Sequence, residues 1–232
     1  MKNLIVFMIC IFFFCSCEKK EEKKIIKSPK GGIDIVSNIY FNASKNLDDV
    51  KSIIVSKINY KDNYIIEIVP EIDFPEIVDK TFLIKDSLFF DISNDSQILF
   101  SETEKKQGNS IHNKTHGAMF SINKIPNYEK RKNLNDTILF EKKYKRFEIS
   151  SKENHSVFYI YQTDTILPYA ICPKQAKEYF GRIERIDSYN KTNDIFISSQ
   201  LIPRNNWDSE ALDIFEFNEF AKKRNNTAGN GK

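Results

Sequence analysis

Cysteine is scarce in this chain of 232 residues. Three of its four cysteines lie within the first 17 residues, and only Cys172 follows them. A domain formed by the rest of the chain therefore cannot contain an intramolecular disulfide, which excludes disulfide-stabilised scaffolds. Such a domain depends on a buried apolar core, and about 200 residues are enough to form one.

Motifs of several enzyme classes are also missing. The chain has seven glycines, and none forms a phosphate-binding loop after a predicted strand. No Gly-x-Ser-x-Gly motif occurs, and the Ser-x-x-Lys spacings that begin at Ser121 and Ser188 lack the partner motifs of penicillin-binding enzymes. The 35 Lys and Arg nearly balance the 32 Asp and Glu, so no strong field would attract a polyanion. We therefore expect no nucleic-acid partner and no cofactor.

The first 17 residues have the layout of an export signal. Lys2 precedes an apolar run at 4–14, which is shorter than the roughly 20 residues of a transmembrane helix. Ser16, a small residue, stands just before Cys17. This stretch resembles the lipobox of bacterial lipoprotein precursors, although Phe14 stands where that family usually has an aliphatic residue. An ordinary secretory signal or an uncleaved short anchor is the alternative.

The resemblance implies removal of residues 1–16 and acylation of Cys17, which would anchor the mature chain to a membrane. Glu18 follows Cys17, and the absence of Asp at this position in Gram-negative lipoproteins is compatible with sorting to the outer membrane. Residues 17–32 are charged and then rich in Pro and Gly, a composition typical of a flexible tether. We therefore expect a lipid-anchored protein of the cell envelope.

Residues 33–224 have the patterns of a single β-rich domain. The runs 52–60 and 63–69 predict a hairpin. Further strands are predicted at 81–85, 87–93, 97–101, 118–123, 137–141, 146–150, 156–163 and 195–201. Many strands and few helices favour a mainly β fold of the α+β class, with an antiparallel sheet and one or two helices. Two lobes that divide near residues 102–135 are the alternative.

Two segments are expected to be helical. Residues 173–180 begin with Pro and are followed by Gly, the usual asymmetry of helix ends. Residues 208–223 can begin at Asp208 as the N-cap and bury one broad apolar face, giving a C-terminal helix. A strand at 214–217 is the alternative for part of this segment. The tail 225–232 is expected to be disordered.

Few side chains suggest chemistry. His112 and His116 are four residues apart, a spacing that suits a metal ion on a helix, but they lie in a polar loop. They are candidates for a metal site, yet no metal is expected, because His155 or a carboxylate would have to be brought close as a third ligand. Cys172 could be a nucleophile near a helix N-terminus, although a buried structural thiol is the favoured interpretation.

Aromatic residues offer a possible binding surface. Tyr159, Tyr161, Tyr169 and Tyr179 could form a platform that stacks on a glycan or a partner protein. Filling of a sheet core is the favoured interpretation of the same residues. Trp207 is expected to pack at the start of the C-terminal helix.

The sequence thus favours a non-enzymatic binding or structural module of the envelope, with an envelope protein or a glycan as its partner. Two alternatives stay open. One is an envelope hydrolase with a site around His112 and His116. The other is a lipid-anchored immunity-type protein that binds a toxin.

The lipobox resemblance predicts the outcome of a Cys17→Ser substitution. We expect the wild-type protein extracted from membranes to begin at Cys17 and to carry acyl chains, because a single acylated cysteine with several chains gives stable anchoring. The variant should lose this added mass and leave the membrane. Intact-mass spectrometry checks both, and equal unlipidated masses for the two proteins would contradict the prediction.

Overall fold

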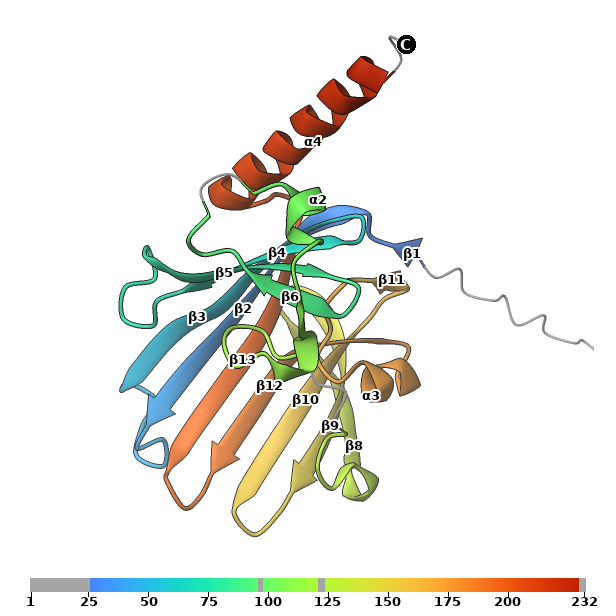
Figure 1. Cartoon of the computed structure of the whole chain (residues 1–232). Helices are drawn as coiled ribbons and strands as arrows, with labels where there is room; N and C mark the ends of the chain where they lie inside the picture. The colour runs from blue at the N-terminus through green and yellow to red at the C-terminus, as the bar shows by residue number, and fades with distance from the viewer. Residues whose placement is uncertain (1–25, 96–97, 121–123, 230–232) are drawn as a thin grey trace, which may run out of the picture.

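The computed structural model describes residues 26–95, 98–120 and 124–229, and eleven strands among them form one antiparallel sheet (Figure 1). The strands of this sheet are β2 (Lys30–Phe41), β3 (Val50–Lys61), β4 (Tyr64–Pro70), β5 (Val78–Lys85), β6 (Leu88–Asp91), β7 (Asn109–Ser110), β8 (Lys132–Leu139), β9 (Lys142–Ser150), β10 (Asn154–Gln162), β12 (Gly181–Asn190) and β13 (Ile195–Arg204). Their order is β7-β6-β5-β4-β3-β2-β13-β12-β10-β9-β8. Two short strands, β1 (Ile26–Lys27) and β11 (Thr165–Ile166), pair in parallel. The predicted fold class is confirmed.

Tight turns join neighbouring strands. The predicted hairpin is confirmed as the pair β3–β4, with Asp62 at φ 54° in its turn. Two-residue loops with positive φ at both positions join β5 to β6, at Asp86 and Ser87, and β8 to β9, at Phe140 and Glu141. Loops of this kind match the right-handed twist of the flanking strands.

One face of the sheet, which we call the covered face, lies beneath irregular segments of the chain. Ile33, Ile58 and Leu201 on this face pack with Ile111 and Ala118 of residues 109–120, the crossing segment. Residues 163–172 add two more apolar side chains to the same core. Nearer β8, a second core forms beneath α3 (Pro173–Glu178). These segments remove much of the covered face from water.

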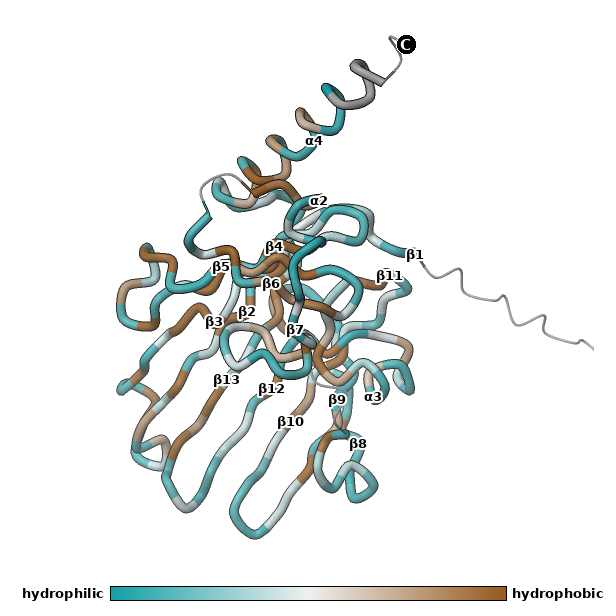
Figure 2. Tube along the Cα trace, in the orientation of Figure 1, coloured by the Kyte–Doolittle hydropathy of each residue, from teal (hydrophilic) through white to brown (hydrophobic). Residues whose placement is uncertain are grey.

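The opposite face, which we call the open face, is packed at its β4–β6 end. Ile66 and Leu83 contact Phe215 of α4 (Ser209–Gly229) and Phe100 of α2 (Phe100–Thr103) in a third core. Figure 2 shows that the turns of α4 nearest the sheet carry mostly apolar residues. Within the part of the chain that the structure describes, no helix has the length and apolar character needed to cross a bilayer.

A buried ion pair fixes the crossing segment to the sheet. Lys114 is 2 % exposed and Glu67 on β4 is fully buried, and the Lys114 Nζ lies 2.8 Å from the Glu67 Oε2. The other carboxylate oxygen accepts hydrogen bonds from the Ser56 hydroxyl (2.8 Å) and the Ala118 backbone N–H (2.6 Å). Burial lowers the pKa of Lys114, and the charge of Glu67 opposes this effect.

Gly117 allows the backbone of the crossing segment to reach Glu67. Its φ of 67° lies in the left-handed region, and a Cβ there would stand 2.3 Å from the Glu67 Oε1. Any side chain would therefore meet both backbone strain and a steric clash. A glycine at this position is a requirement of the buried ion pair.

The predicted tether ends too late in the chain. Residues 26–32 are not free, because β1 and the start of β2 occupy most of them. Gly32 is buried in β2, and a Cβ there would lie 2.6 Å from the guanidinium of Arg204. The glycines thus serve close packing within a strand and do not mark a linker. Residues 1–25, which include Cys17, lie outside the described residues.

Three local predictions were wrong. Residues 98–101 do not form a strand, because α2 begins at Phe100, and residue 97 of this predicted strand lies outside the described residues. Residues 118–120 are irregular, since Ala118 donates its N–H to a carboxylate and not to a neighbouring strand; 121–123 lie outside the described residues. The strand alternative at 214–217 is replaced by α4, which also runs through 225–229 of the predicted disordered tail. Because the first half of α4 packs against the sheet, extending this helix costs little free energy: each added residue also adds a backbone hydrogen bond.

Replacement of Lys114 tests the importance of the buried pair. Lys114→Met leaves the carboxylate of Glu67 uncompensated, so we expect the free energy of unfolding to fall by about 3–5 kcal/mol. Adding Glu67→Gln should recover part of this loss, because the neutral amide oxygen can still accept the two other hydrogen bonds. Urea denaturation of Lys114→Met, Glu67→Gln, the double variant and the wild type checks this, and additive losses would contradict it.

Candidate binding site

A row of polar and aromatic side chains crosses the open face. Arg146 on β9 lies opposite Tyr159 on β10, which lies opposite Arg185 on β12 and then Gln200 on β13. Alternation along β10 places Tyr161 on the same face, while Phe158 and Ile160 enter the core beneath α3. The open face of these strands therefore presents tyrosines between cations.

Tyr159 is flanked by two guanidinium groups. The Arg185 group lies 5.5 Å from the centre of its ring and the Arg146 group 5.9 Å away. Arg185 also donates a 2.7 Å hydrogen bond to Asp187. Burial and the charge of Asp187 raise the pKa of the Tyr159 phenol. This arrangement keeps the phenol neutral and the arginines fixed over its ring.

Glu184 is the buried carboxylate of the site. It is 4 % exposed, and a register shift in the β10–β12 pairing occurs beside it. Its Oε1 accepts a 2.5 Å hydrogen bond from Arg182, and its Oε2 accepts one of 3.0 Å from the Tyr144 hydroxyl. The Lys142 Nζ lies 3.4 Å from the same Oε2. Two cations thus share one carboxylate, which leaves an excess positive charge.

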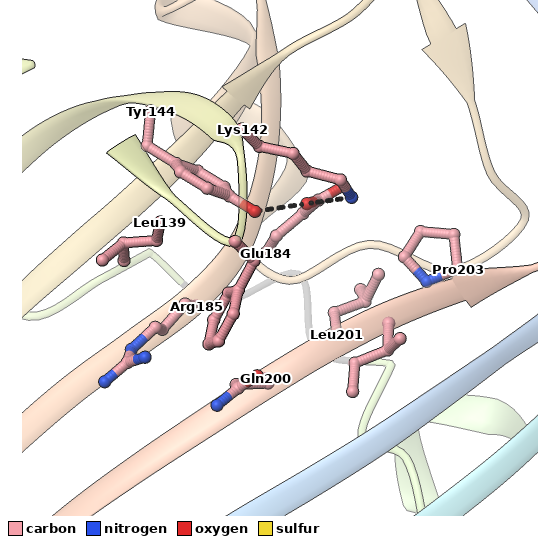
Figure 3. A pocket seen from close by; sticks show the side chains of 10 residues that line it. Leu139, Lys142, Tyr144, Glu184, Arg185, Gln200, Leu201 and Pro203 are labelled. Atoms are coloured by element: carbon pink, nitrogen blue, oxygen red, sulfur yellow. Dashed lines mark hydrogen bonds and ion pairs between the residues drawn. The ribbon is translucent and has the colours of Figure 1, made fainter. Parts of the chain in front are cut away.

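A pocket of about 290 Å³ opens beside Glu184 (Figure 3). Figure 3 shows Lys142 and Tyr144 directed toward Glu184 from the β9 side, with Gln200 and Pro203 along β13 opposite them. The pocket is lined by Leu139, Phe140, Lys142, Tyr144, Glu184, Arg185, Gln200, Leu201, Ile202 and Pro203. Half of these side chains are apolar, and two of the polar ones, Lys142 and Tyr144, contact the buried carboxylate. Such a mixture of apolar walls and a few convergent polar groups is typical of a ligand pocket.

The turn between β8 and β9 places an unusual residue at the pocket. Phe140 has a φ of 50° and its residue is 71 % exposed. Left-handed backbone costs a non-glycine residue roughly 1–2 kcal/mol, and Asn or Gly is the usual choice in such a turn. Phe180 is likewise exposed, at 67 %, and has a φ of 55°, but Phe140 differs from it in lining the pocket. Strain of this kind is typical of functional positions.

The structure does not gather the predicted histidines into a metal site. The Nδ1 of His112 lies 2.9 Å from the carbonyl oxygen of Phe120, and that of His116 lies 3.0 Å from the Thr115 hydroxyl. His155 on β10 bonds Ser150 through its Nδ1. Among the described residues, no group of three or more His, Cys, Asp or Glu could hold a metal ion.

Cys172 lies just before α3 with a φ of 45° and packs against the core beneath that helix. Burial raises the pKa of its thiol, which favours the neutral form over a nucleophilic thiolate. Ser188 hydrogen bonds the Ser156 hydroxyl across β10 and β12. Ser121 lies outside the described residues.

The four predicted platform tyrosines divide between the two faces. Tyr159 and Tyr161 belong to the open face, whereas Tyr169 and Tyr179 pack in the cores of the covered face. Trp207 packs against Phe215 with the two rings tilted and 4.7 Å apart, near the start of α4 as predicted. Core filling is thus confirmed for Tyr169 and Tyr179, whereas a binding role for Tyr159 and Tyr161 stays a prediction.

Sequence reasoning missed the charged residues of the site. Arg182, Glu184 and Asp187 belong to β12, which was not predicted because its alternate positions are charged. Each of these charges has a partner in the folded chain, so the strand tolerates them. Lys142 and Tyr144 belong to no recognisable sequence motif. Ile183 and Ile186 are three residues apart, because the register shift beside Glu184 interrupts the period of two, so β12 lacks the regular alternation of a strand.

Comparison with known proteins places the chain in no family. No family model matches it, and no curated protein does. The structure of PNGF-II is similar over 78% of this chain and 30% of that chain, at 11% identity and a TM-score of 0.33. A DUF1329 family protein from Desulfovibrio piger ATCC 29098 is similar over 77% and 86%, at 12% identity and a TM-score of 0.22. These scores are too low to indicate a shared fold.

The phenol of Tyr144 should lose its proton at a higher pH than that of an ordinary tyrosine. Burial and Glu184 raise the pKa of its phenol above the usual value of about 10. Because the pKa of Tyr144 is higher in the folded than in the unfolded protein, the neutral phenol stabilises the folded state fully below pH 10. This stabilisation is lost as the pH rises through the pKa of the folded state. Alkaline titration followed by ultraviolet absorbance should show that Tyr144→Phe removes signal above pH 10 only. Loss of a step centred at pH 10 would contradict this.

Proposed function

We propose that this protein is a lipid-anchored, non-enzymatic binding module of the cell envelope, and that its open sheet face holds the bound envelope component. The lipobox resemblance at Cys17 supports the location. The pocket beside Glu184 is the observation that carries the binding role, because a strained, exposed Phe140 lines it. Attachment to the outer membrane is part of the proposal.

The two faces of the sheet differ in a way that supports this role. The covered face is filled by the crossing segment and by α3, so its aromatic residues serve the cores. On the open face, Arg146, Tyr159 and Arg185 are only partly buried and keep contact with solvent. Fixed arginine and tyrosine groups are favoured at binding surfaces, because little conformational entropy is lost when a partner binds.

A substitution in the pocket wall tests the proposal. Ile202 is 44 % exposed and lines the pocket, so Ile202→Asn should reduce retention of the bound component about tenfold or more without unfolding the protein. The measurement is photo-crosslinking of the full chain in its own membranes, followed by identification of the crosslinked product in wild type and variant.

A matched control comes from the same strand. Ile197 is 36 % exposed, and strand alternation places it on the other face of β13. Ile197→Asn should leave the crosslinked product unchanged. Equal loss in both variants, or turnover of a substrate that depends on His112 or His116, would contradict the proposed function.

A further inference from the structure

We infer that the pocket beside Glu184 binds an anionic amphiphile, an aliphatic chain that carries a carboxylate. This inference rests on the proposed binding role of the open face and names the chemistry of its ligand. The two parts of such a ligand correspond to two parts of the pocket wall. One part is apolar and exposed to water, and the other has an excess of positive charge.

The apolar part of the pocket wall is exposed to solvent in the free protein. Phe140 is 71 % exposed and Ile202 is 44 % exposed, although both line the same pocket. Leu139 and Pro203 extend this apolar wall between the β8–β9 turn and β13. Apolar surface removed from water stabilises a complex in proportion to its area. An aliphatic chain lying along these four side chains would cover it.

The charged part of the wall selects the head group. Arg182 neutralises Glu184, and Asp187 neutralises Arg185. Lys142, which lies 3.4 Å from the same carboxylate, is then the surplus cation, because the single negative charge of Glu184 faces the two positive charges of Arg182 and Lys142. The side chain of Lys142 is 45 % exposed, so a ligand can reach its ammonium group at the pocket rim. A carboxylate gains an ion pair there, whereas a cationic head group would be repelled.

The turn that carries Phe140 provides a variant that separates binding from folding. Asn is well suited to the left-handed backbone of this turn, so Phe140→Asn should melt no lower than the wild type. The same change removes the aromatic ring from the pocket wall. Ile138 is the matched control, because it is also 71 % exposed and strand alternation places it on the other face of β8.

The experiment is calorimetric titration of the full chain carrying Cys17→Ser, with dodecanoate below its micelle concentration. Dodecyltrimethylammonium, with the same chain and a cationic head group, is the second probe. We expect dodecanoate to bind about tenfold or more tightly than the cation. Phe140→Asn should weaken dodecanoate about tenfold, Ile138→Asn should not change it, and Lys142→Met should abolish the preference for the anion.

Equal affinity for both probes, or equal effects of Phe140→Asn and Ile138→Asn, would overturn the inference, because detergent-like adsorption explains both. Failure of dodecanoate to bind would also overturn it. If Ile202→Asn nevertheless loses the crosslinked envelope product while Ile197→Asn keeps it, the proposed function stands and only the ligand class is wrong.

Discussion

The ion pair between Glu67 and Lys114 decides which face of the sheet is covered. Both groups have lost their water, so the crossing segment can leave the sheet only by exposing an uncompensated buried charge. Gly117 lets the backbone come close enough to supply the Ala118 N–H as a further donor. Without this attachment, the crossing segment would lose its buried polar anchor on the covered face, where residues 163–172 and α3 supply the rest of the packing.

The crossing segment, residues 163–172 and α3 pack on the covered face, and α2 and α4 pack on one end of the open face. The C-terminal helix reaches the β4–β6 end through Phe215, and its outer turns extend away from the sheet (Figure 1). The remaining open face lies on β9, β10, β12 and β13. Arg182 pairs with Glu184 and Arg185 with Asp187 within β12, and these pairings make exposure of the charged face compatible with stability. The same pairing holds Tyr159 and Glu184 in fixed positions, as a binding site requires.

Periodicity predicted those parts of the fold in which one face is apolar and the other polar. The β3–β4 hairpin and the helix beginning near Asp208 were predicted from such patterns. β12 was not, because its charges find partners only in the folded sheet. Glu67 and Lys114 gave no signal either, since their pairing joins residues that are distant in sequence. The sequence left open whether Tyr159 and Tyr161 fill a core or lie on a surface. Only the register of the strands places them on the open face.

The central claim is that the open face is occupied in the envelope. Hydroxyl-radical footprinting compares side-chain exposure in the native membrane with exposure in the purified, delipidated protein. The account predicts protection of Phe140 and Ile202 in the membrane, with Phe220 on α4 and Ile72 in the β4–β5 loop unchanged as exposed references. Unchanged labelling of Phe140, or protection confined to Phe220 and Ile72, would contradict it.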